Sequence, residues 1–163
     1  MPPDLLPAYA ELHCISNFSF LRGASHPEEL CERAASLGYA ALALTDECSL
    51  AGIVRAHLAA KDAGLALVVG SEFTLDDGTR LVLYATDRTT YGDLAQLVTR
   101  GRRQSAKGTY RLARNDVETL AARCLALWLP ADPLAGKVGA DSSGNVGSSE
   151  NVGSDSTFLA VGA

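Results

Sequence analysis

The chain has 163 residues, of which 47% are hydrophobic and 20% are charged, a composition typical of a soluble globular protein with a core of its own. Its net charge of −5 excludes a chain-wide electrostatic surface for nucleic acid, so contact with DNA requires a local basic patch. No apolar run approaches the roughly 18 residues that span a membrane, and no signal peptide is visible. These features predict a cytoplasmic protein without membrane contact.

Short apolar runs alternate with helical patterns in the first half of the chain, and each predicted helix is closed by a glycine. The predicted strands are residues 8–12, 40–45 and 65–69, and the predicted helices are residues 27–37 and 50–63. We expect Ser25 or His26 to cap the first helix and Ser49 to cap the second. The order strand, helix, strand, helix, strand predicts an α/β fold with a parallel sheet and right-handed crossovers.

The second half of the chain begins with a predicted hairpin, because Asp77-Gly78 is a strong turn signal between two apolar runs. Its strands are predicted at 73–75 and 81–85. A helix over 91–103 and a final strand over 125–129 follow. Between them a short helix through Arg123 is expected, with Asn115 or Asp116 as its cap.

The composition changes at Lys137, after which Gly and Ser dominate and the segment Asn-Val-Gly-Ser is repeated. Such a segment buries too little apolar surface to offset its chain entropy. We therefore expect a domain over residues 1–136 and a disordered, low-complexity linker or tail over residues 137–163. Because residues 158–161 (FLAV) resemble the start of another element, we expect the chain to be a truncated fragment.

The four cysteines form no C-x-x-C pair, which excludes a zinc ribbon or a thioredoxin-like redox motif. They are Cys14, Cys31, Cys48 and Cys124. Three of them fall in or next to predicted regular structure. We expect reduced, partly buried thiols.

Polar side chains stand where three successive strands are predicted to end: His13, then Asp46 and Glu47, then Glu72. Neighbouring parallel strands lie about 5 Å apart, so their ends share one edge of the sheet. An imidazole with carboxylates suits a divalent ion such as Zn or Mn, which activates water for phosphoester hydrolysis. The alternative is structural: Asp46 caps the helix that begins near Ser49, and Glu72 is only solvated.

A basic run follows in the second half of the chain, with Tyr110 inside it. Its members are Arg100, Arg102, Arg103, Lys107, Arg111 and Arg114. The first four are candidate phosphate contacts for a nucleic acid. The alternative is a solvated helix end whose cations complement the helix dipole.

Three segments appear in order at characteristic intervals: residues 11–25 (ELHCISNFSFLRGAS), 44–52 (LTDECSLAG) and 69–73 (VGSEF). They resemble the N-terminal PHP (polymerase and histidinol phosphatase) domain of bacterial error-prone C-family DNA polymerases. The resemblance covers about residues 8–130. It implies a partial, distorted α/β barrel with mainly parallel strands and a metal site at the strand ends.

The family's metal ligands carry over only in part. His13 matches the first histidine of a His-x-His motif, whose second position is Ile15, and Glu72 also matches. Glu47 replaces the histidine of Thr-Asp-His, and Arg22 stands where many members have an acidic residue or a histidine. The resemblance therefore implies at most one weakly held Zn or Mn ion, at His13, Glu47 and Glu72.

The resemblance implies a fragment of an error-prone DNA-directed DNA polymerase that acts in translesion synthesis and DNA repair. The fragment itself would be a structural module without polymerase activity. The Mg-binding carboxylates of nucleotidyl transfer would belong to a palm domain outside this chain. The implied partners are DNA, through the parent protein, and other DNA-damage-response polymerase proteins. The alternative is a metal-dependent PHP-type phosphoesterase.

Overall fold

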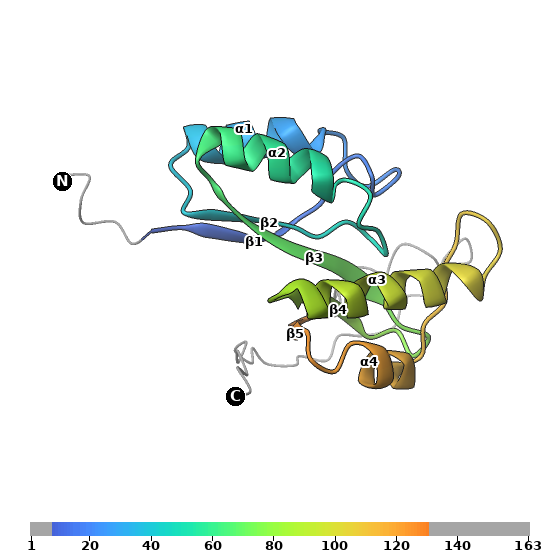
Figure 1. Cartoon of the computed structure of the whole chain (residues 1–163). Coiled ribbons are helices and arrows are strands. Elements are labelled where there is room, and N and C mark those ends of the chain that lie inside the picture. Colours follow the sequence, from blue (N-terminus) through green and yellow to red (C-terminus); the bar gives the residue numbers. More distant parts are fainter. Residues whose placement is uncertain (1–7, 131–163) are drawn as a thin grey trace, which may run out of the picture. The chain divides into compact units, whose positions relative to one another are not determined.

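The computed structural model describes residues 8–130, in which five strands form one sheet in the order β1-β2-β3-β4-β5 (Figure 1). The elements are β1 (Ala10–Cys14), α1 (Pro27–Ser36), β2 (Ala41–Leu44), α2 (Ile53–Ala63), β3 (Ala66–Thr74), β4 (Arg80–Ala85), α3 (Arg88–Arg103), α4 (Arg114–Leu120) and β5 (Leu125–Leu129). The predicted tail over 137–163 and its boundary at residue 136 lie outside the described residues.

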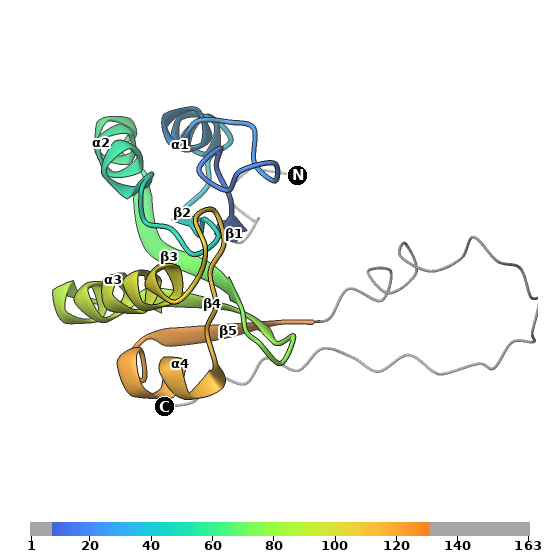
Figure 2. The ribbon, with the colours of Figure 1, turned by 90° about the vertical axis from the view of Figure 1, so that its right-hand side faces the viewer.

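Four of the five strands run in the same direction. β1 pairs with β2 and β2 with β3 in parallel, whereas β4 is antiparallel to both of its neighbours, β3 and β5. The prediction of an α/β fold with mainly parallel strands is therefore confirmed. The sheet is curled rather than flat (Figure 2), as the twist of successive strands requires.

The helices cover one face of the sheet in two pairs (Figures 1 and 2). Under α1 and α2 a cluster of small and branched side chains packs against Leu42 and Leu44 of β2. A second cluster includes Phe73 of β3 and Leu83 of β4, which pack against Leu94 and other apolar residues of the α3–α4 region. Leu44 lies opposite Val69 in the ladder, and Phe73 is four residues beyond Val69 on β3. Because side chains alternate along a strand, Leu44 and Phe73 share one face of the sheet, which receives both helix pairs.

The opposite face carries a smaller cluster built on Ala43, Val82 and Tyr84. Glu72 lies directly across from Val82 in the β3–β4 ladder, and Arg80 is two residues from Val82 on the same strand. By the alternation of side chains, Glu72 and Arg80 share this second face. We call it the inner face, and it carries the polar side chains considered below.

The predicted break in the third strand is wrong. The sequence predicted that the third strand ends at residue 69 and that a hairpin begins at residue 73. In the structure, β3 runs without a break from Ala66 to Thr74. Gly70 and Glu72 are fully paired with β4. The polar triplet at 70–72 is therefore a strand interior, in which glycine allows a close approach of the neighbouring strand.

Two helix starts also differ from the expectation. Ser49 does not cap α2, which begins after Gly52; the Ser49 hydroxyl instead accepts a hydrogen bond from the amide of Ala51 at 3.2 Å. Neither Asn115 nor Asp116 is the N-cap of α4, which follows Ala113. Short polar side chains form such local turns as readily as caps, and the pattern alone does not distinguish the two.

Other termini agree with the sequence. His26 is the N-cap of α1, as one of the two predicted candidates. Gly38 and Gly64 follow the first two helices with φ of 74° and 67°. This left-handed conformation suits glycine because it lacks a Cβ. The final strand also matches its prediction, at Leu125–Leu129.

We expect Gly70→Ala to lower the free energy of unfolding by about 2 kcal/mol, since overpacking of a buried site costs about 1–3 kcal/mol. A methyl group at Gly70 would lie 2.9 Å from the carbonyl oxygen of Leu83 and 2.9 Å from the ring of Tyr84. Gly92→Ala is the matched control, because its methyl would meet nothing within 4 Å. In a helix this change stabilises by up to about 1 kcal/mol. Urea denaturation checks both values, and equal effects of the two changes would contradict the prediction.

Candidate functional site

A gap in the sheet creates the site. β2 ends at Leu44, opposite Cys14, the last residue of β1, while β3 continues to Thr74. The chain then turns through Asp46 and Glu47, and Glu47 forms an isolated parallel bridge with Glu72 of β3. The amide of Cys48 also donates to the carbonyl of Glu72 at 2.9 Å. Glu72 therefore lies beside Glu47, just beyond the carboxyl ends of β1 and β2, although it is within β3 rather than at its end. We call this place the edge.

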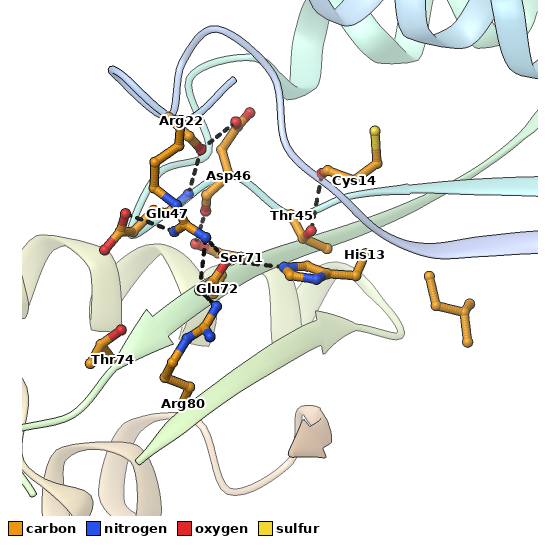
Figure 3. Close-up of polar contacts among 12 residues, drawn as sticks. His13, Cys14, Arg22, Thr45, Asp46, Glu47, Ser71, Glu72, Thr74 and Arg80 are labelled. Atoms are coloured by element: carbon orange, nitrogen blue, oxygen red, sulfur yellow. Dashed lines mark hydrogen bonds and ion pairs between the residues drawn. The ribbon is translucent and has the colours of Figure 1, made fainter. Parts of the chain in front are cut away.

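His13 reaches this edge from β1. The pairing of β1 with β2 shifts between Glu11 and Cys14, where β1 has one more residue than its partner. Such an extra residue bends a strand and redirects a side chain. The Nε2 atom of His13 lies 3.0 Å from Oε2 of Glu72. The structure thus brings His13, Glu47 and Glu72 to one edge, as the sequence predicted (Figure 3).

Glu72 is fully buried, and both of its oxygens are occupied by side-chain donors. Oε1 accepts from Arg80 at 2.8 Å and from Arg22 at 3.2 Å. Oε2 accepts from Arg22 at 3.0 Å and lies 3.0 Å from His13. A carboxylate offers about four lone-pair sites. All four are engaged in this arrangement.

These contacts set the charge of Glu72. Burial acts to raise the pKa of this carboxyl, but the hydrogen bonds from His13, Arg80 and Arg22 outweigh it and lower the pKa to about 2. Glu72 is therefore ionised at neutral pH. A buried charge of this kind requires compensation, and the two guanidinium groups provide it.

Arg22 links the two glutamates. Its Nη1 donates to Oε2 of Glu47 at 2.8 Å, while Nη2 donates to both oxygens of Glu72 (Figure 3). The other oxygen of Glu47 accepts from the phenol of Tyr110 at 3.0 Å. Burial raises the pKa of Tyr110 to about 12, so this phenol keeps its proton and donates.

The side chain of Asp46 holds the loop between β1 and α1. It neither caps a helix nor lines an open site. Its Oδ1 accepts from the amide of Ser16 and the hydroxyl of Ser19, and its Oδ2 accepts from the hydroxyl of Ser16, each at 2.7 Å. The Asp46 side chain is buried with these donors around it. The proposed helix-capping role of Asp46 is therefore wrong.

Sequence reasoning missed several members of the site: Ser16, Ser19, Arg80, Tyr110 and, as a contact, Arg22. One signal existed for Arg80. With the hairpin centred on Asp77-Gly78, residue 82 pairs with residue 72, and residue 80 becomes a diagonal neighbour of Glu72 on the same face. No sequence signal indicates the long-range contacts of Tyr110 or of the two serines.

Arg102, one of the predicted nucleic-acid contacts, is directed at the backbone. Its guanidinium donates to the carbonyls of Cys48 and Glu47 at 3.2 Å and stacks 5.4 Å from the ring centre of Tyr110. Cys48 has a φ of 43°, so Arg102 supports a strained turn next to Glu47. An open cleft of about 590 Å³ lies beside these residues, with Phe18 and Phe20 on its wall.

The other three predicted nucleic-acid contacts lie at and after the end of α3. Arg100 forms an ion pair with Asp116 at 3.4 Å. Arg103 and Lys107 are exposed. Phosphate contact by these residues stays a prediction.

The four cysteines are free thiols, as expected. Burial raises the pKa of Cys14 and of Cys48 to about 11, so neither is a thiolate at neutral pH. None of the four helices within residues 8–130 has the length and apolarity that crossing a bilayer requires.

The residues of this edge do not fit a bound metal ion as they are arranged. Within the described part of the chain, no group of three or more His, Cys, Asp or Glu side chains is positioned to hold one. The lone pairs of Glu72 are engaged by protein donors, and Ile15 has no ligand atom. Zn or Mn at His13, Glu47 and Glu72 stays a prediction that this geometry does not favour.

Comparison with protein families identifies the fold. The model of the PHP domain matches residues 11–145, which is most of the chain. The chain belongs to the PHP domain family. The expected partial PHP-type α/β barrel is thereby confirmed for the described strands and helices.

This PHP domain is similar to part of several error-prone DNA polymerases. It is 61% identical over 133 residues to that of Methylococcus capsulatus, covering 81% of this chain and 13% of the relative. It is 61% identical over 132 residues to the error-prone DNA polymerase of Dechloromonas aromatica, covering 78% of this chain and 13% of the relative. It is 61% identical over 125 residues to the error-prone DNA polymerase of Pseudomonas aeruginosa, covering 77% of this chain and 12% of the relative. The chain therefore spans about one eighth of the length of these relatives.

Two solved structures are similar to part of this chain. One is a protein from Bifidobacterium adolescentis assigned as a metal-dependent phosphoesterase, with a TM-score of 0.50 and 28% identity, covering 60% of this chain and 34% of that one. The other is an amidohydrolase from Chromobacterium violaceum with bound sulfate and no metal, with a TM-score of 0.51 and 31% identity, covering 59% and 34%.

Proposed function

We propose that this PHP domain is part of an error-prone DNA-directed DNA polymerase and that its role there is structural. The observation that carries the proposal is the 61% identity to three such polymerases over most of the chain. In this role the domain supports a polymerase core that performs Mg-dependent nucleotidyl transfer in a separate palm domain. The parent protein would act in translesion synthesis and DNA repair in the cytoplasm, with DNA and other DNA-damage-response polymerase proteins as partners.

The geometry of the edge supports a structural rather than a hydrolytic role. A catalytic metal site keeps one position open for water or substrate. Here the oxygens of Glu72 and Glu47 are all engaged by side chains of the domain itself. Asp46 is likewise occupied by Ser16 and Ser19. The polar groups thus tie together β1, β3 and the intervening loops.

Contact with DNA is proposed at the end of α3. Arg103 and Lys107 present exposed cations there, and Arg100 lies in the same turn as Arg103. Their attraction to phosphates would be independent of sequence and would weaken with salt. Arg102 contributes less, because its donors are engaged by backbone carbonyls.

The alternative function is that of a metal-dependent phosphoesterase. It is favoured by the likeness to the Bifidobacterium adolescentis protein that carries this assignment. The partial overlap with that protein and the occupied carboxylates weigh against it. Stoichiometric Zn or Mn together with turnover of phosphate esters would support this alternative.

We expect the purified chain to extend no primer and to hydrolyse no phosphate ester. The tests are a primer–template assay with Mg²⁺ and dNTPs, and release of nitrophenol from bis(p-nitrophenyl) phosphate with added Mn²⁺ or Zn²⁺. His13→Ala should leave both readouts at background, because His13 serves only to hold Glu72. Metal-dependent hydrolysis that His13→Ala abolishes would overturn the structural role. Primer extension by the chain alone would contradict the assignment of catalysis to another domain.

A further inference from the structure

We propose that Arg22 is the resident cation of this edge, so that its guanidinium replaces a divalent metal ion, and that removing it creates a metal site. The inference deepens the structural role and rests on it, because an edge filled by the chain's own cation performs no metal-dependent hydrolysis.

The contacts of Arg22 are those that a bridging ion would make. One nitrogen contacts Glu47 at 2.8 Å and the other contacts Glu72 at 3.0 and 3.2 Å. The two carboxylates come from segments that lie side by side through the bridge between residues 47 and 72. A guanidinium is a planar fork of donors that matches carboxylate geometry, whereas a lysine ammonium is a single compact charge. Arg22 therefore joins both carboxylates at once.

The charges of Glu47 and Glu72 are balanced without an ion from solution. Glu47 and Glu72 together carry two negative charges. Arg22 contacts both of them, and Arg80 contacts Glu72 from the opposite side at 2.8 Å. The two guanidiniums together supply two positive charges, the same as one divalent ion. A metal ion added to this arrangement would meet cations and no free lone pair on Glu72.

The loop that carries Arg22 is fixed independently of the ion pairs. Ser16 and Ser19 bind the buried Asp46, and the amide of Asn17 donates to the carbonyl of Ser25 at 2.9 Å, which closes the loop. A Cβ at Gly23 would overlap the carbonyl of Ser16, so only glycine fits there without a shift of the backbone. The guanidinium is thus delivered by a preorganised loop.

Removal of Arg22 would vacate three hydrogen-bond positions on two carboxylates, next to the imidazole of His13. An imidazole and two carboxylates are a ligand set for Mn²⁺. Mn²⁺ is the better probe here, because thiolate ligands select Zn²⁺ and the chain has four free cysteines.

The test compares wild type with Arg22→Ala, and with Arg22→Met, which keeps the aliphatic volume if the alanine variant folds poorly. Arg123→Ala is the matched control, since Arg123 also makes three hydrogen bonds, all to Asp93. Mn²⁺ affinity is measured by calorimetric titration, metal content by mass spectrometry, and Tm with and without EDTA. We expect both Arg22 variants to bind Mn²⁺ at least about tenfold tighter than wild type or Arg123→Ala, a gain of about 1.4 kcal/mol.

We also expect EDTA to leave the Tm of wild type unchanged, and Mn²⁺ to raise the Tm of the Arg22 variants only. The proposal is overturned if the wild-type chain carries about one equivalent of metal or loses Tm in EDTA. It is equally overturned if neither Arg22 variant binds Mn²⁺ better than Arg123→Ala. Metal in a wild-type chain that hydrolyses nothing would refute this inference alone, whereas phosphoester hydrolysis would refute the proposed structural role.

Discussion

Glu72→Gln is expected to lower the free energy of unfolding by about 3 kcal/mol, because removing one partner of a buried ion pair leaves an uncompensated charge. Glutamine keeps the shape of the side chain but removes the charge that Arg22 and Arg80 share. Its amide group also places donors opposite donors of Arg22, Arg80 or His13. The two arginine side chains are about one third exposed, at 33% and 32%, so water offsets part of the cost. The value therefore lies at the low end of the range for a buried pair.

Glu47→Gln is the graded comparison for this prediction. Glu47 is 30% exposed and has one contact with Arg22 and one with Tyr110, whereas Glu72 is fully buried with four. We expect its change to cost about 1 kcal/mol, as for other partly solvated ion pairs. Urea denaturation at pH 7 measures both. If Glu72→Gln costs no more than Glu47→Gln, the buried charge is not what the arginines stabilise.

Acid should remove the same contribution from the wild-type protein. The pKa of Glu72 is about 2 in the folded state against 4.5 as its ordinary value, so the folded state binds this proton less tightly than the unfolded chain. The group therefore contributes stability above its unfolded pKa, and that contribution is lost as the pH falls toward its folded pKa. A shift of this size corresponds to about 3 kcal/mol, of which about 2 kcal/mol is lost by pH 3.

The Glu72→Gln variant isolates this effect from other carboxyl groups. Asp77 also has a pKa lowered to about 2, first by hydrogen bonds from the Thr79 backbone and side chain, so wild-type acid sensitivity has more than one source. The difference in free energy of unfolding between wild type and Glu72→Gln removes such shared terms. We expect that difference to narrow by about 2 kcal/mol between pH 7 and pH 3. A difference that stays constant would show that the charge of Glu72 is not the titrating contribution.

The alternating first half of the chain was the part best predicted from sequence. The period of its apolar residues and the glycines at 38 and 64 give the order and approximate bounds of β1 to α2. The extent of β3 could not be predicted in the same way. Gly70-Ser71-Glu72 reads as a turn by composition, and only the neighbouring strand β4 makes it a strand. The local preference of these residues for a turn is overridden by pairing with residues 10 to 14 positions away.

The membership of the site was predicted in part, and its occupant was not. His13, Glu47 and Glu72 do meet at one edge, because the ends of parallel segments converge. Residue types cannot reveal what neutralises two carboxylates, however, since an external ion and an internal arginine satisfy the same electrostatic need. The distinction depends on where the loop places Arg22, 25 and 50 residues from its two partners in the sequence.

The bridge formed by Arg22 has a consequence for how the domain depends on its surroundings. A ligand from solution stabilises a fold only by mass action, in proportion to the logarithm of its free concentration, and chelators withdraw it. Arg22 is part of the same chain as its partners, so its effective concentration at the two carboxylates is fixed by the backbone and does not depend on the solution. The fold at this edge is therefore expected to persist in a cell starved of transition metals as well as in one that is replete.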